Sequence, residues 1–367
     1  MALPNPRSMR LEIDVLVWRG AIPESRHRIQ AVAVSADGRV AFETAQTGLI
    51  TSFRSAAKPF QALPLVERGH AKRWLWSDEE LAVMCASHTG SPYHVALVSR
   101  ILDRIGLSAA NLACGYHEPI DPESLEHVRA HPESRSRLYN NCSGKHAGML
   151  CLALSEGWPV SGYERADHPL QQLMRRTVAE VCGVDPEAMA VAVDGCGVSV
   201  FGLSLAAMAR GYARLAAADP AGDARERALH RIRSAMVSHP RAVGGAGRLS
   251  TRLMEAGHGA LVAKGGAEGL ECAALVRDGI GLVVKAEDGA ERALGPATVA
   301  LLDRFELFTA SDREGLEDVA RPRVENHAKL EVGVLEATIR IREAAAPGSE
   351  PRDSAAVPHG PARRNHA

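Results

Sequence analysis

Residues 54–59 carry the stretch Arg54-Ser55-Ala56-Ala57-Lys58-Pro59, around which the rest of the chain is organised. A serine and a lysine three residues apart lie on one face of a helix, with Cβ atoms about 5–6 Å apart. Pro59 cannot continue a helix that has run a full turn, so Ser55 should lie near a helix start. A neutral Lys58 could then take the proton of Ser55 and make it a nucleophile. The alternative is an ordinary helix start with a solvated lysine, because short motifs also match by chance.

The composition excludes several classes of function. The 367 residues are 46% hydrophobic and 24% charged, as in globular proteins. A formal net charge of −1 attracts neither nucleic acid nor an anionic membrane, and 4% aromatic residues offer little surface for base stacking. The start of the chain lacks the apolar core of a signal peptide, and no stretch approaches the roughly 18 apolar residues of a membrane helix. Together with seven scattered cysteines, this predicts a cytoplasmic protein with reduced thiols and no nucleic-acid or membrane partner.

The hydrophobic pattern predicts an α+β fold. Apolar residues alternate at 11–17, as in a half-buried strand, and the turn signals Asp37-Gly38 and Asp278-Gly279 each predict a hairpin. Helical periods fill the middle of the chain, and one of these helices begins with a capping box at Ser77-Asp78-Glu79-Glu80. The last strand is expected at 330–341. We therefore predict one antiparallel sheet, built from N- and C-terminal strands, with a helical middle region packed against it.

The same pattern suggests the domain organisation. We expect a single α+β domain at 10–343, with a helical subregion at about 55–257. Residues 1–9 and the tail at 344–367 lack a hydrophobic pattern, and the tail is rich in proline and glycine, so both are predicted to be disordered. Glu24-Ser25-Arg26-His27 is predicted to form a loop.

Two further motifs follow Ser55 and Lys58 along the chain. Some serine hydrolases use Ser-x-x-Lys, then a second serine, then Lys-Thr-Gly on a strand. Here Ser87 follows the helix that the capping box begins, and Lys264-Gly265-Gly266 lies in a predicted strand, although its middle residue differs from the threonine of that motif. The order of the three motifs supports a serine-hydrolase site that contains Ser55, Lys58, Ser87 and Lys264.

A second group of residues consists of Cys142, Lys145, His146, Asp194 and Cys196. Thiolates and imidazoles are natural zinc ligands. The spacing of Cys142 and Lys145 is not that of a zinc finger, however, and a lysine must lose its proton before it binds a metal. The spacing alone therefore favours two small buried cysteines and a helix start over a metal site.

The glycine run Gly244-Gly245-Ala246-Gly247 precedes Arg248. It lacks the strand and the lysine of a phosphate-binding loop. We interpret it as a flexible turn before a helix. Arg248 is then a helix-start cation, either solvated or facing the site.

Several longer blocks add to these motifs. They are Arg19-Gly20 with Glu24-Ser25-x-His27, Arg54 to Gln61, Ala86-Ser87-His88-Thr89-Gly90, Cys142 to His146, Asp194-Gly195-Cys196-Gly197, Gly247-Arg248 with Thr251, and Lys264-Gly265. Together they resemble the rhizobial-type (class three) L-asparaginases over about residues 12–340. The resemblance implies a fold similar to that of serine β-lactamases and glutaminases. It also implies hydrolysis of L-asparagine to aspartate and ammonia by an enzyme that is typically a homodimer.

The resemblance further implies a metal. Cys142, Lys145 and Cys196 would match the zinc ligands of that family, which reverses the interpretation from spacing alone. We therefore expect a Zn²⁺ ion in a structural or substrate-positioning role, with His146 and Asp194 nearby.

The resemblance also pairs Ser55 with Lys58 and Ser87 with Lys264. Ser55 is expected to attack the side-chain amide with Lys58 as its base, while Ser87 and Lys264 relay a proton. The spacing leaves open the alternative in which Ser87 is the nucleophile. For substrate binding, Arg54 is expected to hold the α-carboxylate and Asp194 the α-ammonium group, with His146 close by.

Three other functions remain as alternatives. A glutaminase, or a β-lactam or peptide-bond hydrolase, could use the same scaffold. A non-catalytic module that binds an amino acid or a metal could use the same pocket. The absence of an expected signal peptide weighs against substrates outside the cytoplasm, and two serine–lysine pairs weigh against a protein that only binds.

Overall fold

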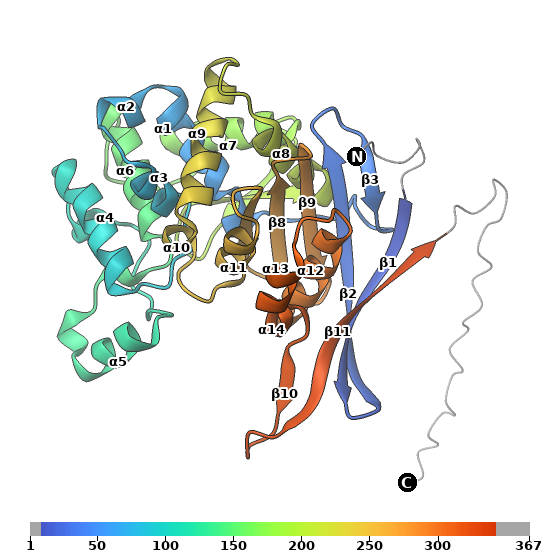
Figure 1. Cartoon of the computed structure of the whole chain (residues 1–367). Coiled ribbons are helices and arrows are strands. Elements are labelled where there is room, and N and C mark those ends of the chain that lie inside the picture. Colours follow the sequence, from blue (N-terminus) through green and yellow to red (C-terminus); the bar gives the residue numbers. More distant parts are fainter. Residues whose placement is uncertain (1–8, 343–367) are drawn as a thin grey trace, which may run out of the picture.

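The computed structural model describes residues 9–342, which form a mixed α+β fold with a large, mostly antiparallel sheet, as predicted (Figure 1). The strands of this sheet run in the order β10-β11-β1-β3-β2-β9-β8-β7. Their bounds are β1 (Met9–Arg19), β2 (Ile22–Ser35), β3 (Val40–Glu43), β7 (Leu261–Gly266), β8 (Leu270–Leu275), β9 (Ile280–Ala286), β10 (Arg323–Glu325) and β11 (Glu331–Arg342). The expected disordered tail at 344–367, and most of the expected disordered start, lie outside the described residues.

The two ends of the described chain meet in this sheet. β1 pairs with β11, with Leu11 opposite Ile341, and β2 pairs with β9, with Ile29 opposite Ala286. Both pairings are antiparallel, whereas β1 and β3 pair in parallel. The hairpins around Asp37-Gly38 and Asp278-Gly279 are present as predicted.

The helices follow in chain order. Their bounds are α1 (Lys58–Glu67), α2 (His70–Arg73), α3 (Asp78–Met84), α4 (Pro92–Arg104), α5 (Pro122–Ala130), α6 (Ser143–Ser155), α7 (Pro169–Cys182), α8 (Leu205–Ala217), α9 (Ala224–Ser238), α10 (Pro240–Val243), α11 (Leu249–Ala256), α12 (Leu294–Asp303), α13 (Ala310–Gly315) and α14 (Glu317–Ala320). The predicted capping box is present at the start of α3, where Ser77 and Glu80 bond each other's backbone N–H groups. No helix among residues 9–342 is both long enough and apolar enough to span a membrane.

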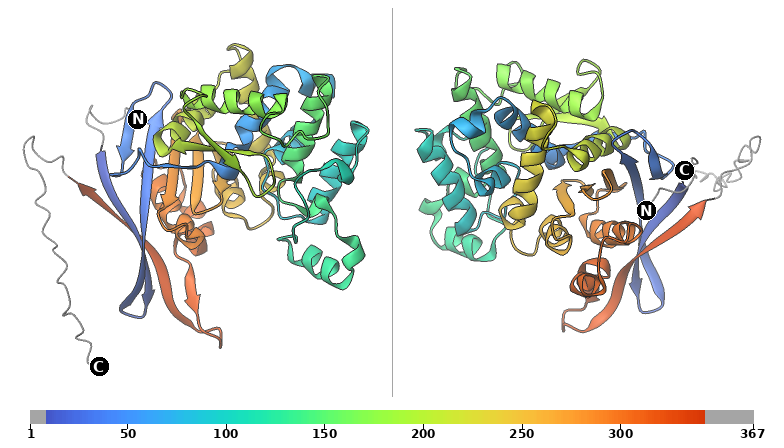
Figure 2. Two further views of the ribbon diagram at one scale, coloured as in Figure 1. Left: turned by 180° about the vertical axis from the view of Figure 1, so that it is seen from behind. Right: turned by 45° about the horizontal axis from the view of Figure 1, so that its top comes forward.

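Helices cover both faces of the sheet at its centre. Every residue of β8 and β9 is buried, which requires cover on both sides. α8 packs against β9 so closely that a Cβ atom at Gly281 would lie 1.9 Å from the carbonyl oxygen of Ala209. α12 lies on the opposite face with α13 and α14 beside it, and most of the helices between α1 and α10 form a second lobe beside the sheet (Figures 1 and 2).

A second, three-stranded sheet was not predicted. It has the order β4-β6-β5, formed by β4 (Ile50–Ser52), β6 (Ser199–Ser204) and β5 (Ala190–Val193). β4 and β6 are about 150 residues apart in the chain, so no local pattern reveals that they pair.

The prediction of a loop at 24–27 is also wrong, because these residues lie in β2. A tight turn at Gly20, with φ of 55°, returns the chain at once, so that Arg19 lies opposite Ile22. Polar side chains on this exposed end of the strand hid it from the hydrophobic pattern.

Candidate active site

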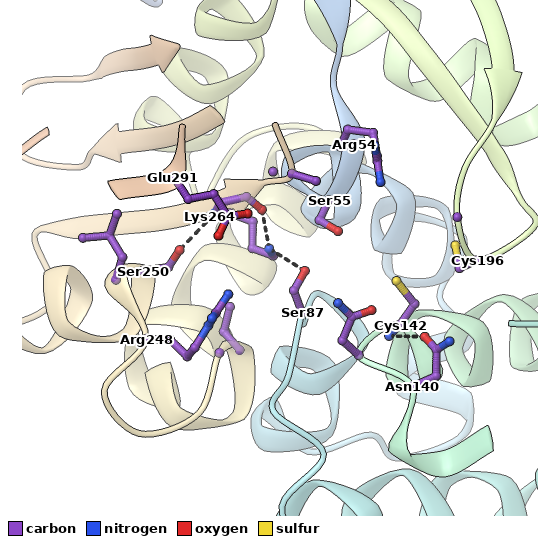
Figure 3. Close-up of a pocket in the computed structure, with 18 of the residues that line it drawn as sticks. Arg54, Ser55, Ser87, Asn140, Cys142, Cys196, Arg248, Ser250, Lys264 and Glu291 are labelled. Atoms are coloured by element: carbon purple, nitrogen blue, oxygen red, sulfur yellow. Dashed lines mark hydrogen bonds between the residues drawn. The ribbon is translucent and has the colours of Figure 1, made fainter. Parts of the chain in front are cut away.

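A cavity of about 460 Å³ opens where the large sheet, the small sheet and the helical lobe meet (Figure 3). Ser55 comes from the 3₁₀ turn η1 (Arg54–Ala57), Ser87 from the loop after α3, and Lys264 from β7. Cys142 and Cys196 lie on the far wall, at the start of α6 and in the turn between β5 and β6. The fold thus brings most of the predicted site residues into one cavity.

Ser87 is at the centre of the polar network in this cavity. Its Oγ atom accepts a hydrogen bond from Lys58 Nζ at 2.8 Å and a second from Lys264 Nζ at 2.8 Å. A hydroxyl oxygen has two lone pairs, so these two bonds use both of them. The hydroxyl proton of Ser87 is then free to be donated into the cavity.

Each lysine is held by a second, backbone contact. Lys58 is the first residue of α1 and donates to the carbonyl oxygen of Ala86 at 2.6 Å. Lys264 donates to the carbonyl oxygen of Gly265 at 2.7 Å. Both side chains are almost fully buried, so neither amine is free to turn toward water.

Burial shifts the proton equilibria of both lysines. It lowers the pKa of Lys58, and it lowers the pKa of Lys264 to about 7, helped by the nearby charge of Lys58. Burial is the largest cause for both lysines, and a nearby cation adds to it, namely Lys145 for Lys58 and Lys58 for Lys264. An amine that loses its proton this readily can act as a base.

Ser55 faces the same cavity from the turn that precedes α1. Its position near a helix start agrees with the prediction from Pro59, which lies in the first turn of α1. Ser55 Oγ makes no hydrogen bond to any residue in the range 9–342, and Lys58 is bonded to Ser87 instead. The residue before Ser55, Arg54, has φ of 46°, a left-handed conformation that is uncommon for a residue with a side chain and marks strain at functional sites.

Arg54 and Asp194 were predicted to bind opposite ends of a substrate, but here they bind each other. The Arg54 Nε atom lies 2.8 Å from Asp194 Oδ1. Burial raises the pKa of Asp194, but the charges of Lys145 and Arg54 outweigh it, so that the net pKa lies below the usual value. Asp194 is therefore a carboxylate, and the charge of Arg54 is already compensated.

The predicted zinc ligands form one cluster. Lys145 Nζ lies 2.9 Å from Cys196 Sγ. A hydrogen bond from Cys196 and the charges of Lys58 and Lys145 hold the pKa of Cys142 well below its usual value despite burial. The same bond, together with burial, raises the pKa of Cys196. Burial lowers the pKa of Lys145, but the charges of the two sulfur atoms outweigh it, so the net pKa of Lys145 is raised.

This cluster contains two sulfur atoms and one nitrogen atom, which are ligands that zinc prefers. Among residues 9–342, no group of three or more His, Cys, Asp or Glu side chains is placed to hold a metal, so a site here depends on Lys145 as third ligand. Cys142, Cys196 and Lys145 are linked by hydrogen bonds, and a bound cation would displace the protons of these bonds. The donor set therefore fits a zinc ion.

His146 lies behind the cavity wall and is fully buried. Its Nδ1 atom bonds to the hydroxyl of Tyr163 at 2.5 Å, and its Nε2 atom has no partner among the described residues. Burial and the charge of Lys145 lower its pKa well below the usual value. The structure thus places a neutral histidine beside Lys145 without bringing it to the cavity surface.

One residue in the cavity wall was missed, the buried carboxylate of Glu271 on β8. Its Oε1 atom accepts a bond from Ser250 Oγ at 2.9 Å, and Ser250 Oγ accepts one from the N–H of Gly265 at 2.9 Å. Gly265 in turn receives the bond from Lys264 through its carbonyl oxygen. Burial raises the pKa of Glu271 to about 7, against the opposing charge of Lys264.

A signal for Glu271 is present in the sequence, because it is the single charged residue in the apolar strand 270–275. A charge inside an apolar strand requires a partner or a function. The antiparallel pairing of β7 and β8 places Glu271 opposite Gly265, the residue next to Lys264.

Comparison with known proteins identifies the family. The sequence profile described as L-asparaginase II matches residues 15–337, which is most of the chain. This protein belongs to the L-asparaginase II family. The description of this family suggests an amidohydrolase of the asparaginase type, whereas the activity, the rhizobial subtype and the substrate of this family member remain predictions.

No curated protein matches this L-asparaginase II family member. Among solved structures, Mglu in its native form in 4.3 M NaCl aligns with 17% identity over 77% of this chain, at a TM-score of 0.42. The alignment spans 62% of the Mglu chain, less than two thirds of its length. A putative beta-lactamase from Bacteroides dorei DSM 17855 aligns with 12% identity over 75% of this chain and 93% of its own, at a TM-score of 0.39.

Proposed function

We propose that this protein hydrolyses the side-chain amide of L-asparagine to L-aspartate and ammonia, with Ser55 as nucleophile. Membership of the L-asparaginase II family supports the reaction class. The observation that carries the proposal is the convergence of Lys58 and Lys264 on Ser87 in a cavity that Ser55 also lines. Such a network can take a proton from one hydroxyl and deliver a proton to a leaving group, as amide hydrolysis requires.

We assign the roles of the two serines from the hydrogen bonds that their hydroxyl oxygens accept. Both lone pairs of Ser87 Oγ accept bonds from lysine amines, so this oxygen is poorly suited to attack a carbonyl carbon. Ser55 Oγ has no such bonds among the described residues and lies in the first turn before α1, where backbone N–H groups favour developing negative charge. We therefore assign the attack to Ser55 and the proton donation to Ser87.

Lys58 acts as the base for Ser55. A neutral amine has two N–H donors and one lone pair, and Lys58 already uses its donors on Ala86 and Ser87. The third position of this nitrogen faces the sulfur of Cys142. Its lone pair reaches the proton of Ser55, three residues earlier in the chain, once that contact is released. Catalytic hydrogen bonds often shorten only when substrate binds, so the absence of a Ser55–Lys58 bond in the free protein is compatible with this role.

The reaction then has two stages. Ser55 Oγ attacks the side-chain carbonyl carbon and gives its proton to Lys58, while Ser87 donates its proton to the amide nitrogen and is reprotonated by the lysines. Ammonia leaves, and a β-aspartyl ester remains on Ser55. Water then attacks this ester, its proton passes back through the network, and L-aspartate leaves with Ser55 restored.

The substrate's α-ammonium group is assigned to Asp194, a partly buried carboxylate at the cavity wall. Arg54 holds this carboxylate in place and lies on the same wall. His146 supports that wall from behind, because it follows Lys145 on α6 and shares the bond to Tyr163.

We also propose a Zn²⁺ ion held by Cys142, Cys196 and Lys145. The resemblance to class-three L-asparaginases suggests it, and the neighbouring sulfur and nitrogen atoms support it. Such an ion would supply positive charge that fixes the two loops carrying these residues and helps to orient substrate. The same resemblance suggests a serine β-lactamase-like fold and a homodimer, and the scattered cysteines suggest a cytoplasmic location.

Ammonia release tests the function directly. The purified protein should release ammonia from L-asparagine, with L-glutamine and a chromogenic β-lactam assayed beside it. Faster turnover of L-glutamine would make it a glutaminase, and hydrolysis of the β-lactam alone would make it a hydrolase of another class. Binding of L-asparagine without release of ammonia would leave only the non-catalytic module.

A further inference from the structure

The cavity contains a second arginine, Arg248, whose guanidinium group has no anion in contact among residues 9–342. Its side chain points into the cavity toward Lys264 and Ser87 (Figure 3). Within residues 9–342 it makes no side-chain hydrogen bond and no ion pair within 4 Å, although Glu271 and Lys264 are near enough to feel its charge. Arg54, by contrast, is paired with Asp194 at 2.8 Å.

The backbone holds Arg248 at this position. Gly245 has φ of 103°, and a Cβ atom there would lie 2.7 Å from the side chain of Thr89. A Cβ atom at Gly244 would lie 2.5 Å from Thr251 Oγ1. The glycine run is a turn before a helix, as predicted, and its first two residues pack tightly against Thr89 and Thr251.

The same segment is bonded to the catalytic loop. The N–H of Ser87 donates to the carbonyl oxygen of Val243 at 3.0 Å. Arg248 then begins α11, without capping that helix through its side chain. The backbone of Arg248 is thus held close to that of Ser87, and its side chain is not needed to start the helix.

An uncompensated guanidinium beside the reacting groups calls for an anion on the ligand. Its planar fork matches a carboxylate, with two parallel N–H···O bonds. An amino acid whose side-chain amide lies at Ser55 and Ser87 has one anionic group, the α-carboxylate. We infer that Arg248 binds the α-carboxylate of the substrate and so restricts the site to free amino acids. This inference rests on the proposed function and reassigns to Arg248 the role predicted for Arg54.

The test compares L-asparagine with its α-(N-methyl)amide, which keeps the ammonium group and side-chain amide but lacks the carboxylate. Arg248→Gln should raise KM for L-asparagine about 10- to 100-fold, the range expected for one lost charged hydrogen-bonding pair. Its kcat should change little, because the contact is equally strong in ground and transition states. KM for the methylamide should stay as in the wild type, and Arg248→Lys should restore part of the discrimination.

Arg241→Gln is the matched control. Arg241 lies on α10, just before the glycine run, but its guanidinium pairs with Glu255 outside the cavity. This variant should keep the wild-type preference for L-asparagine.

Three results would overturn the inference: an unchanged KM in Arg248→Gln, an equal loss on both substrates, or loss of discrimination in Arg54→Gln while Arg248→Gln keeps it. Calorimetric binding of L-aspartate to wild type and Arg248→Gln measures the same contact without turnover. A wild type that binds L-aspartate through Arg248 but releases no ammonia would refute the proposed function and support the inference. Equal binding by both proteins would refute the inference, whatever the activity.

Discussion

Replacement of Ser87 by alanine separates its two roles, one in stability and one in proton transfer. The change removes the acceptor of two hydrogen bonds of 2.8 Å from buried amines, while each amine keeps one carbonyl acceptor. A buried polar group that loses a partner costs about 1–3 kcal/mol. Two such losses give about 2–6 kcal/mol, with the lower end expected because Ser87 lines a cavity that water can enter.

The effect of Ser87→Ala on the rate follows from its proposed donation to the leaving nitrogen. General acid catalysis contributes about 10²- to 10⁴-fold, so kcat for L-asparagine should fall within that range. Urea unfolding measures the stability, and single-turnover kinetics measure ester formation on Ser55. The leaving group of an ester or a hydroxamate depends less on protonation than the amide nitrogen does. The rate of Ser87→Ala should therefore fall less with the ester or hydroxamate derivative of the substrate than with the amide.

Two outcomes would refute this reasoning. Wild-type kcat in a folded Ser87→Ala protein would show that the two lysine contacts serve stability alone. An equal loss on the amide and on the ester derivative would show that Ser87 does not protonate the leaving group. The second outcome would favour Ser87 as nucleophile.

Three other predictions concern groups around this network. In the wild type, the carboxylate of Glu271 opposes the loss of the Lys264 proton, so Glu271→Gln should shift any ionisation of Lys264 in the pH profile of kcat from about 7 to lower pH. An unchanged profile would contradict an interaction between these two side chains. Because the pKa of Lys264 is lowered on folding, the unfolded chain binds more protons between about pH 8 and 10, so the stability of the wild type relative to Lys264→Met should rise by up to about 1.4 kcal/mol per pH unit; a falling or flat difference in urea unfolding would show that Lys264 is not buried as described. Protein purified without chelator should contain one zinc per chain by metal analysis, lost in Cys142→Ser or Cys196→Ser together with some substrate affinity; undiminished zinc in both variants, or none in the wild type, would return these residues to a core role.

The sequence predicted those parts of the fold whose signals are local. The capping box at Ser77, the hairpin turns and the alternating strand at the start of the chain each appear where their patterns place them. The small sheet was missed because β4, β5 and β6 are short and their partners lie far away in the chain. β4 leads directly into the turn that carries Ser55, so this omission concerned the element that positions the proposed nucleophile.

The candidate site shows the same division. Residue types and motif order singled out two serines and two lysines, and the structure places Ser55, Ser87 and Lys264 at one cavity, with Lys58 buried behind Ser87. The pairing of Lys58 with Ser87 depends on two side chains from different elements, which the helical spacing of Ser55 and Lys58 could not reveal. Similarly, the ion pair between Arg54 and Asp194 joins residues far apart in the chain and could not be predicted from their spacing. It leaves Arg248 as the arginine of the cavity wall that has no anion in contact among residues 9–342.

The most direct test of the mechanism is to find the residue that carries the acyl group. The wild-type reaction with L-asparagine is stopped with acid within the first turnover, the protein is digested, and peptide masses are measured. We predict an added β-aspartyl group on the peptide that contains Ser55, and none on that peptide in Ser55→Ala. An adduct on the peptide that contains Ser87, or full turnover by folded Ser55→Ala, would contradict the mechanism.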